Sequence, residues 1–206
     1  MSDLNPNPSQ QSSTGRNVVV AVAAIATILA LVSAFAWPGW AVRSSNQPAP
    51  SASVQSATPS VSASSLPANA SALLNALPNT VGEFARQGIT STQNWAGNGP
   101  IEEYTVVYSN GDSSRDITLV LAQWESSDDA TNTYTELRNA LSGEVQAHGN
   151  IKAANTTTGK YVVVTDGDGD PTDSTQAEAL WRNDTVVFQA SGAYASVQAF
   201  YLGFPM

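Results

Sequence analysis

The sequence contains no cysteine and a single histidine, and only 12% of its 206 residues are charged. The lack of cysteine excludes disulfides, thiolate metal sites, cysteine nucleophiles and an N-terminal lipidated cysteine. One histidine excludes metal sites that need several imidazoles. Basic residues are also scarce, eight against 17 acidic ones, and the net charge of −9 argues against nucleic-acid binding, which requires a basic face.

One long uncharged run lies near the N-terminus, over residues 18–42. Between Val18 and Ala36 all but two side chains are apolar. As a helix, the segment from Val18 to Trp40 would span about 34 Å, enough to cross a bilayer core of roughly 30 Å. Trp37 and Trp40 end the run, where indole rings favour the membrane interface. The sequence therefore predicts a transmembrane helix over residues 18–42, preceded by a disordered polar tail over residues 1–17.

A cleaved signal peptide is the alternative interpretation of this run. Residues 34–36 have the small-x-small form that signal peptidase accepts, and cleavage near Ala36 would release a secreted protein. An uncleaved anchor is favoured, because the run exceeds the usual 7–15 residues and a bulky Trp37 would follow the cut. Arg16 and Arg43 flank the run equally, so the length of the C-terminal part sets the expected orientation: N-terminus in the cytoplasm, C-terminal domain outside.

Residues 43–68 have the composition of a flexible linker. Nine serines and four prolines fall within residues 44–68, and no apolar periodicity is present that would build a core. Residues 69–206 form the expected globular domain, with 16 acidic and six basic residues and a net charge of −10. The layout resembles that of many bacterial envelope proteins with one anchor, a spacer and an outer domain. This resemblance covers the architecture and carries no catalytic residue.

The patterns in residues 69–206 predict an α+β domain. A short helix is expected over residues 70–76, strands over 81–90, 103–109, 116–124, 160–165, 178–182 and 185–190, and helices over 126–143 and 193–202. Ser126 and Asp129 form a capping-box-like start for the longer helix. Strands followed by a helix, twice, indicate two layers: an antiparallel sheet with the two main helices on one face.

An acidic segment is the sharpest candidate for a metal site. Asp166, Asp168 and Asp170 alternate with glycines, and Asp173 follows, which resembles the start of a calcium-binding loop. Pro171 stands where an EF-hand requires glycine, so the EF-hand pattern fails. A weak, irregular calcium site and a solvated acidic turn both remain open; no other cofactor is expected.

Two tryptophans are candidate binding residues. Trp95 lies in a segment rich in Gly and Asn, where an exposed aromatic residue often makes contacts. Trp124 ends a predicted strand, where core packing is the plainer interpretation. His148 is a candidate general base, but no Gly-x-Ser-x-Gly nucleophile motif accompanies it, so a surface histidine is favoured.

These observations lead to two hypotheses of function. The first is a single-pass, membrane-anchored, non-enzymatic binding module of the cell envelope, whose partner is another envelope protein or a wall polymer. The alternative is an extracytoplasmic hydrolase or transferase that uses Asp and Glu residues, with or without calcium. It requires convergent carboxylates in a concave pocket.

Overall fold

The computed structural model describes residues 58–153, 156–167 and 169–205. The predicted tail, transmembrane helix and first part of the linker therefore lie outside the described residues. Within the described ranges, no helix is both long enough and apolar enough to cross a membrane. The anchor over residues 18–42 stays a prediction from the sequence.

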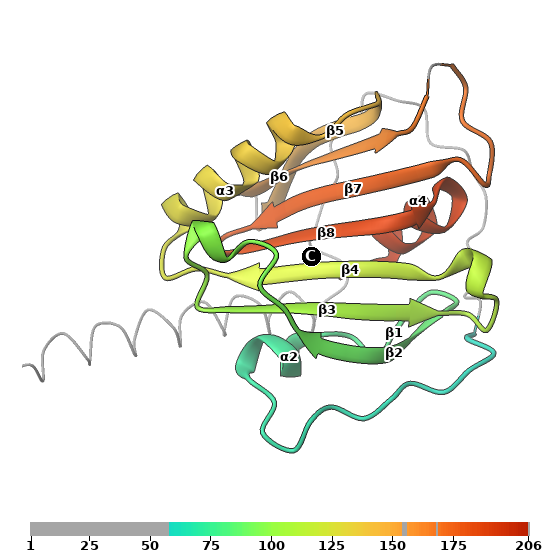
Figure 1. Ribbon diagram of the computed structural model, residues 1–206, viewed down its shortest axis with the longest axis horizontal. Coiled ribbons are helices and arrows are strands. Elements are labelled where there is room, and N and C mark those ends of the chain that lie inside the picture. Colours follow the sequence, from blue (N-terminus) through green and yellow to red (C-terminus); the bar gives the residue numbers. More distant parts are fainter. Residues whose placement is uncertain (1–57, 154–155, 168, 206) are drawn as a thin grey trace, which may run out of the picture.

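An eight-stranded antiparallel sheet forms the centre of an α+β domain (Figure 1), with strand order β1-β2-β3-β4-β8-β7-β6-β5. The strands are β1 (Thr80–Val81), β2 (Phe84–Ser91), β3 (Glu102–Ser109), β4 (Ile117–Gln123), β5 (Glu144–Ala153), β6 (Thr156–Thr165), β7 (Gln176–Asn183) and β8 (Val186–Ala193). Two meanders of four strands thus meet where β4 pairs with β8. Each meander is followed by a helix along the chain.

Among the described residues, three α-helices pack on this sheet: α2 (Ala72–Ala76), α3 (Ser127–Ala140) and α4 (Tyr194–Gly203). The two main helices lie on opposite faces, which corrects the prediction that both cover one face. Ala130 and Tyr134 of α3 join a cluster with Val162, Leu180 and Val187. Phe200 and its neighbours in α4 instead pack with the alternate strand positions Val163, Ala179, Trp181 and Phe188. Successive strand residues point to opposite faces, so the two helices sandwich the sheet.

The face under α4, here called the α4 face, holds the larger core. Tyr108, Ile117, Leu119 and Leu121 are fully buried there, together with leucines from α2. Trp181 stacks on Phe188 at 5.1 Å between ring centroids and meets Tyr201 and Phe204 edge-on. Such aromatic pairs add to the area they bury. This face is therefore covered along most of the sheet and carries most of the burial.

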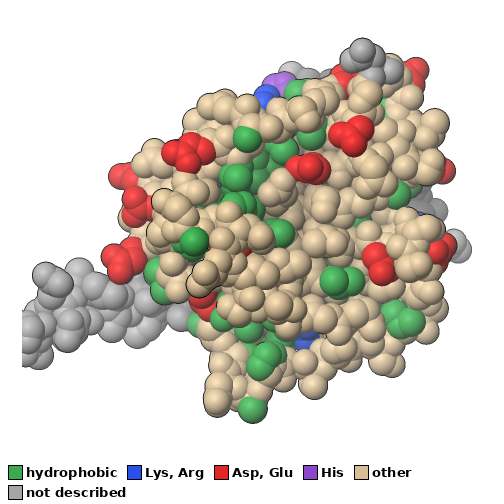
Figure 2. Space-filling model, viewed as in Figure 1, with side chains coloured by type: hydrophobic (Ala, Val, Ile, Leu, Met, Phe, Trp, Pro, Cys, Tyr) green, Lys and Arg blue, Asp and Glu red, His purple; other side chains and the backbone are tan. Residues whose placement is uncertain are grey.

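The opposite face, here called the α3 face, is covered by the described residues over only part of its width. Val162, Val163 and Val164 of β6 are all buried, so both faces of the sheet are covered there. In β4 the pattern changes: Leu119 is buried while Thr118 is exposed and Val120 is half-buried. Figure 2 views this face and shows mostly uncharged atoms over β2–β4, with scattered hydrophobic side chains.

Residues 58–66 lie against the domain, which differs from the flexible linker predicted for them. The Ser64 amide donates to the main-chain oxygen of Arg86 at 2.7 Å, and Leu66 packs against the core of the α4 face. The Gln87 side chain donates to the main-chain oxygen of Ser62. The difference arises from these hydrogen bonds to β2, because the composition of a segment carries no information about such contacts.

Arg86 holds this segment in place. Its side chain is 1% exposed, and its guanidinium donates to the main-chain oxygens of Leu77, Pro78 and Ser64 and to the side chain of Asn79. None of these partners is a carboxylate. A guanidinium presents five donors in a fixed fork, which suits a set of converging carbonyl oxygens. Arg86 thus joins β2 to the segment before α2 and to the turn after it.

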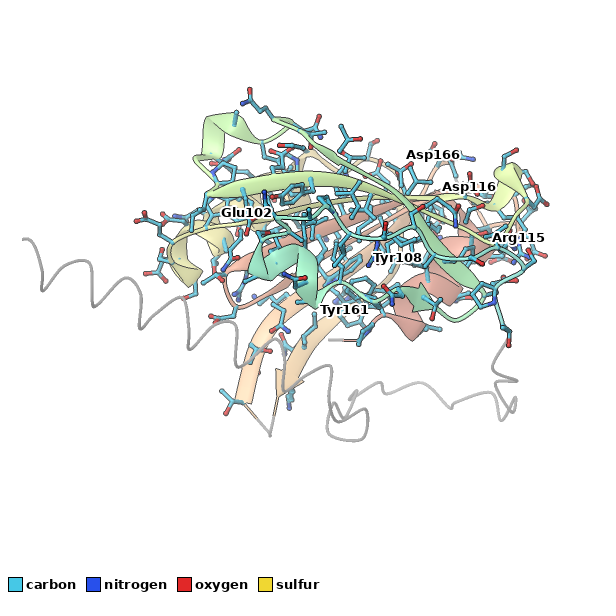
Figure 3. All side chains as sticks on the ribbon, turned by 90° about the horizontal axis from the view of Figure 1, so that it is seen from below. Glu102, Tyr108, Arg115, Asp116, Tyr161 and Asp166 are labelled. Atoms are coloured by element: carbon cyan, nitrogen blue, oxygen red, sulfur yellow. The ribbon has the colours of Figure 1, made fainter. Side chains whose placement is uncertain are left out.

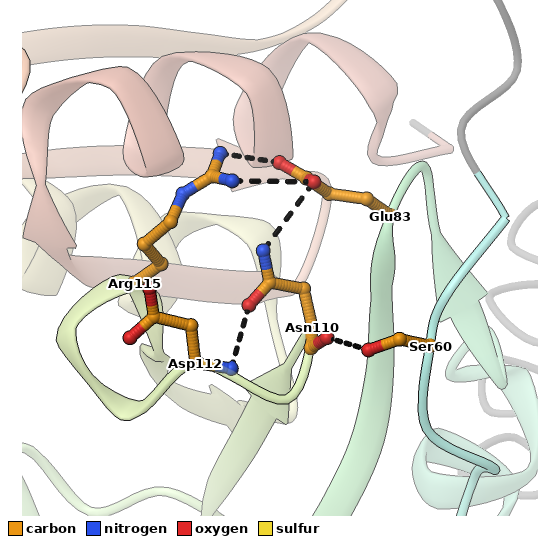
Figure 4. A network of polar contacts seen from close by, with 5 residues as sticks. All are labelled: Ser60, Glu83, Asn110, Asp112 and Arg115. Atoms are coloured by element: carbon orange, nitrogen blue, oxygen red, sulfur yellow. Dashed lines mark hydrogen bonds and ion pairs between the residues drawn. The ribbon is translucent and has the colours of Figure 1, made fainter.

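A polar network closes the turn end of β1–β4 (Figure 4). Arg115 forms an ion pair with Glu83 at 2.5 Å, and the Asn110 side chain donates to the same carboxylate. Ser60 donates to the main-chain oxygen of Asn110, and the Asp112 amide donates to the Asn110 side chain. The network connects the segment before α2 to two turns of the sheet. It also pairs the positive charge of Arg115 with Glu83.

Candidate functional site

Trp95 is buried, contrary to the prediction that it is an exposed contact residue. It is 7% exposed, and its ring stacks on Trp124 at 6.2 Å between centroids. Trp124 is 1% exposed, and its indole nitrogen donates to the main-chain oxygen of Asn98. The two rings join the core cluster beneath α3. The geometry gives both residues a packing role, and a part in binding stays a prediction.

Glu103 is the reason why the loop before β3 turns Trp95 inward. Its carboxylate is 4% exposed and accepts hydrogen bonds from the amides of Asn94 and Trp95 at 2.6 and 2.8 Å. The Thr92 hydroxyl donates to the same carboxylate at 3.0 Å. A carboxylate that accepts main-chain N–H groups orders a loop in the way a helix N-cap does. Glu103 therefore fixes the conformation of the loop before β3.

The acidic segment does not assemble a metal site in the part of the chain that is described. Asp166, Asp170 and Asp173 are exposed, and no group of three acidic or histidine side chains among the described residues is placed to hold a metal ion. Asp168 lies outside the described residues. Figure 3 shows Asp166 at the same end of the sheet as Asp116, and both side chains come from strand ends. The calcium site remains a prediction.

His148 lies on β5, a strand that the sequence patterns did not predict. It pairs with Val162 of β6 and faces α3, where a groove of about 540 Å³ separates the helix from the β5–β6 hairpin. This groove, called the α3 groove below, is lined by Tyr134, Thr135, Arg138, His148, Asn150 and Lys160, with parts of Gly149 and Tyr161. Its polar groups are hydrogen-bond donors or neutral groups, and no nucleophile–base pair is present among its lining residues.

A larger hollow of about 1020 Å³ lies where β4 begins and α4 starts. Its lining includes Asp116, Asp173 and five serines, among them the fully buried Ser196. Within the described residues, the Ser196 hydroxyl and one Asp116 oxygen have no hydrogen-bond partner. Arg115 also lines the hollow, but its charge is already paired with Glu83. The hollow therefore favours neutral or weakly polar groups over anions.

The part of the α3 face that no described helix covers extends across three strands, β2, β3 and β4. Two cross-strand rows form it, Thr90–Thr105–Val120 and Gly88–Val107–Thr118. We call the surface made by Thr90, Thr105, Val107, Thr118 and Val120 the open half-sheet. Its side chains are short, uncharged and either exposed or half-buried. Short β-branched side chains lose little conformational entropy on contact, so such a surface is suited to non-covalent recognition.

Several residues of interest were missed by sequence reasoning. Arg138, Lys160 and Arg182 come from three elements, and only the strand register brings the two strand residues together. Tyr134 of α3 is 7% exposed and belongs to the core cluster beneath the helix, yet it also lines the groove. The three basic residues are separated by 22 positions each along the chain, so no local pattern in the sequence groups them.

A scan of the chain against protein-family models finds no match, and a search of curated proteins finds no relative. Function is therefore inferred from the residues of this chain alone.

Proposed function

We propose that the chain is a single-pass membrane protein whose C-terminal domain is a non-enzymatic binding module outside the cytoplasm. Residues 18–42 serve as the anchor, with the N-terminus in the cytoplasm, and residues 43–57 as the spacer. The partner is another envelope protein or a wall polymer. The open half-sheet is the observation that carries this proposal, because no helix of the described residues covers the α3 face of these three strands.

Photo-crosslinking tests the binding role. A crosslinking residue replaces Thr118, an exposed position on the β4 side of the open half-sheet, in the full chain in native membranes. Gln198 is the matched control, because it is exposed on α4 at the opposite face. We expect adducts to one envelope protein or to wall glycan from position 118 only. Equal adducts from both positions, or none from position 118, would count against the proposal.

A cysteine-labelling experiment tests the anchor and its orientation. Because the chain has no cysteine, a single introduced thiol reports on one position without background. We expect a membrane-impermeant maleimide to label Thr118→Cys on intact cells and to leave Ser9→Cys unlabelled until the cells are lysed. Loss of Ser9 from the mature chain would instead indicate cleavage near Ala36, and labelling of Ser9→Cys alone would reverse the orientation.

The hydrolase alternative has one location to support it, the hollow at the start of α4. Asp116 and Asp173 both line it, and one oxygen of Asp116 lacks a partner among the described residues. Glycoside hydrolysis needs two carboxylates that face each other across the scissile bond. Release of new reducing ends from wall glycan by the native chain, abolished in Asp116→Asn, would establish this alternative.

A further inference from the structure

Two like charges are paired directly across strands at the edge of the α3 groove. In the register of β6 and β7, Lys160 is the partner of Arg182, and Asn150 of β5 is the partner of Lys160 on its other side. Directly paired residues of an antiparallel sheet have Cβ atoms about 5 Å apart. Like charges in such a pair destabilise the sheet. The domain therefore carries an electrostatic cost at this place.

No carboxylate among the described residues offsets this cost with an ion pair. The ion pair formed within that part of the chain joins Arg115 and Glu83, at the turn end of β1–β4. Asp184 is the acidic neighbour of Arg182, but the guanidinium donates to its main-chain oxygen at 2.8 Å. Burial lowers the pKa of the Arg182 guanidinium, and the Asp184 carboxylate opposes that shift. The positive charges are thus close together and incompletely compensated.

Helix α3 adds a third cation above the strand pair. Arg138 follows Tyr134 by one helical turn, so both side chains lie on the same side of the helix. Tyr134 is within electrostatic range of both Arg138 and Arg182, so its hydroxyl lies near the helix cation and near the sheet cation. His148 from β5 completes the wall on the other side. Cations therefore line the α3 groove from two sides: Arg138 from the helix and Lys160 from the sheet.

The sign of the charge around the α3 groove differs from that of the rest of the domain. Residues 69–206 carry a net charge of −10, yet three of their six basic residues and the only histidine gather at or beside one groove. Thr135, Tyr134 and Asn150 supply neutral hydrogen-bond donors in the same lining. Acidic side chains are absent from the described lining of the groove. The groove is therefore a local site of opposite sign on an acidic molecule.

We propose that the α3 groove binds the phosphodiester groups of an anionic envelope polymer. The inference rests on the proposed function, because it names the ligand of the module. A carboxylate is planar and is best held by one guanidinium fork, whereas a phosphate directs oxygens toward several sides and suits donors from a helix and two strands. The groove of about 540 Å³ also exceeds one phosphate and has room for the adjoining polyol or sugar units.

Binding of a defined polymer to the full chain tests the proposal. The chain is held in non-ionic detergent, and fluorescently labelled poly(glycerol phosphate) is titrated with it while anisotropy is recorded. We expect saturable binding that weakens as sodium chloride is raised, because the contact is largely electrostatic. Lys160→Gln should bind about tenfold more weakly, which corresponds to about 1.4 kcal/mol.

Lys152→Gln is the matched control, since it removes the same charge from the same hairpin at a position that does not line the groove. It should bind as the native chain does. Thermal unfolding shows that the fold is intact: Lys160→Gln should unfold at the same or a higher temperature than the native chain, because its like-charge pair is relieved. Inorganic phosphate should raise the unfolding temperature of the native chain and not that of Lys160→Gln.

Three competitors separate the possible sources of the same chemistry. Polygalacturonate offers carboxylates, single-stranded DNA offers phosphodiesters with bases, and phosphatidylglycerol in mixed micelles offers a lipid headgroup. Equal competition by polygalacturonate or DNA would overturn the proposal in favour of unspecific charge attraction, and competition by the lipid alone would reassign the site to a membrane surface. Absence of polymer binding would also overturn the proposal. In that case, adducts from position 118 would still support the function as a binding module.

Discussion

At the residue scale, burial of polar side chains explains more of this domain than any catalytic arrangement does. Glu103 and Arg86 are both almost fully buried, and the charged group of each makes hydrogen bonds with several main-chain groups. Such groups are costly to leave without partners in the interior. Their effects on stability are therefore expected to exceed those of the exposed acidic residues.

Glu103→Ala should destabilise the domain by about 2–4 kcal/mol, because two main-chain amides and a threonine hydroxyl lose their acceptor. The Trp95–Trp124 stack should loosen with the loop, so tryptophan fluorescence should shift to the red before global unfolding. Urea unfolding followed by fluorescence measures both effects. Glu102→Ala is the control; that side chain is half-buried, accepts from Tyr104, and should cost less than about 1 kcal/mol.

The stability of the domain should fall at alkaline pH. Burial raises the pKa of the Tyr108 hydroxyl above its ordinary value of 10.0. The unfolded chain therefore releases this proton above pH 10 while the folded chain keeps it, so each further pH unit costs about 1.4 kcal/mol until the folded pKa is reached. Burial also raises the pKa of Tyr134 and adds to the slope.

Urea midpoints between pH 8 and pH 11 measure this dependence. Tyr108→Phe should reduce the slope above pH 10, although it also removes the hydrogen bond to Pro78 and lowers stability at neutral pH. An identical slope in the native chain and in Tyr108→Phe would contradict the assignment. Figure 3 shows Tyr108 among the side chains inside the domain, where its hydroxyl is shielded from solvent.

Predictions about single residues failed where a partner from another part of the chain decides how the residue is placed. Trp95 sits among glycines and asparagines, which predicted exposure, but the carboxylate that turns it inward comes from β3, eight residues further along. Gly149 is similar: a Cβ atom there would lie 2.8 Å from the Tyr161 ring across the β5–β6 pair. Neither contact can be inferred from local composition, because both are set by strand register.

At the scale of elements, the prediction was best where local signals are strong. Helix α3 begins with Ser126 as N-cap, as predicted; its hydroxyl accepts from the Asp129 amide at 3.1 Å. The hairpin of β7 and β8 turns at Asp184, which has a positive φ of 51° and lies between the strands predicted over residues 178–182 and 185–190. Capping and turn chemistry involve neighbours in sequence, so they can be identified without a structure.

Ser126→Ala should cost about 1 kcal/mol, since one amide of the first turn loses its acceptor. Circular dichroism during urea unfolding measures the loss. Ser127→Ala is the matched control at the next position, where no side-chain cap is made, and should change stability by no more than about 0.5 kcal/mol. A loss in the control as large as in Ser126→Ala would contradict the capping role.

Strand β5 was missed because it lies at the sheet edge and is mostly polar. Gln146, His148, Asn150 and Lys152 alternate with small residues and Ile151, so the apolar period that marks a half-buried strand is weak. The face of the sheet that each helix covers could also not be predicted from the sequence. The sequence patterns of the two strand–helix units are alike, but α3 and α4 pack on opposite faces.

At the scale of the whole molecule, the segment before α2 joins regions that are far apart along the chain. Ser64 contacts Arg86 of β2, and Ser60 contacts Asn110 after β3. The predicted boundary at residue 69 rested on composition, which cannot distinguish a free linker from one held along a sheet. The division into tail, anchor and linker ahead of residue 58 stays a prediction.

Arg86→Lys should destabilise the domain by about 3 kcal/mol, because an ammonium cannot reach four acceptors in the geometry of a guanidinium. Hydrogen exchange in residues 58–66 should rise in the same variant under native conditions. Arg115→Lys is the matched control in a partly exposed ion pair, with an expected cost of up to about 1 kcal/mol. Unchanged exchange in residues 58–66 would show that Arg86 does not hold the segment.

The contacts of residues 58–66 also decide how the domain responds to mechanical load. A pull on the chain ahead of residue 58 reaches Ser60 first, then Ser62, then Ser64, so the attachments to Asn110, Gln87 and Arg86 are stretched one after another. Bonds that are loaded in sequence yield at lower force than bonds that share the load. The segment would then extend by about 3.5 Å per released residue while the eight strands keep their register. Under tension on the chain ahead of residue 58, this segment can thus lengthen before the sheet unfolds.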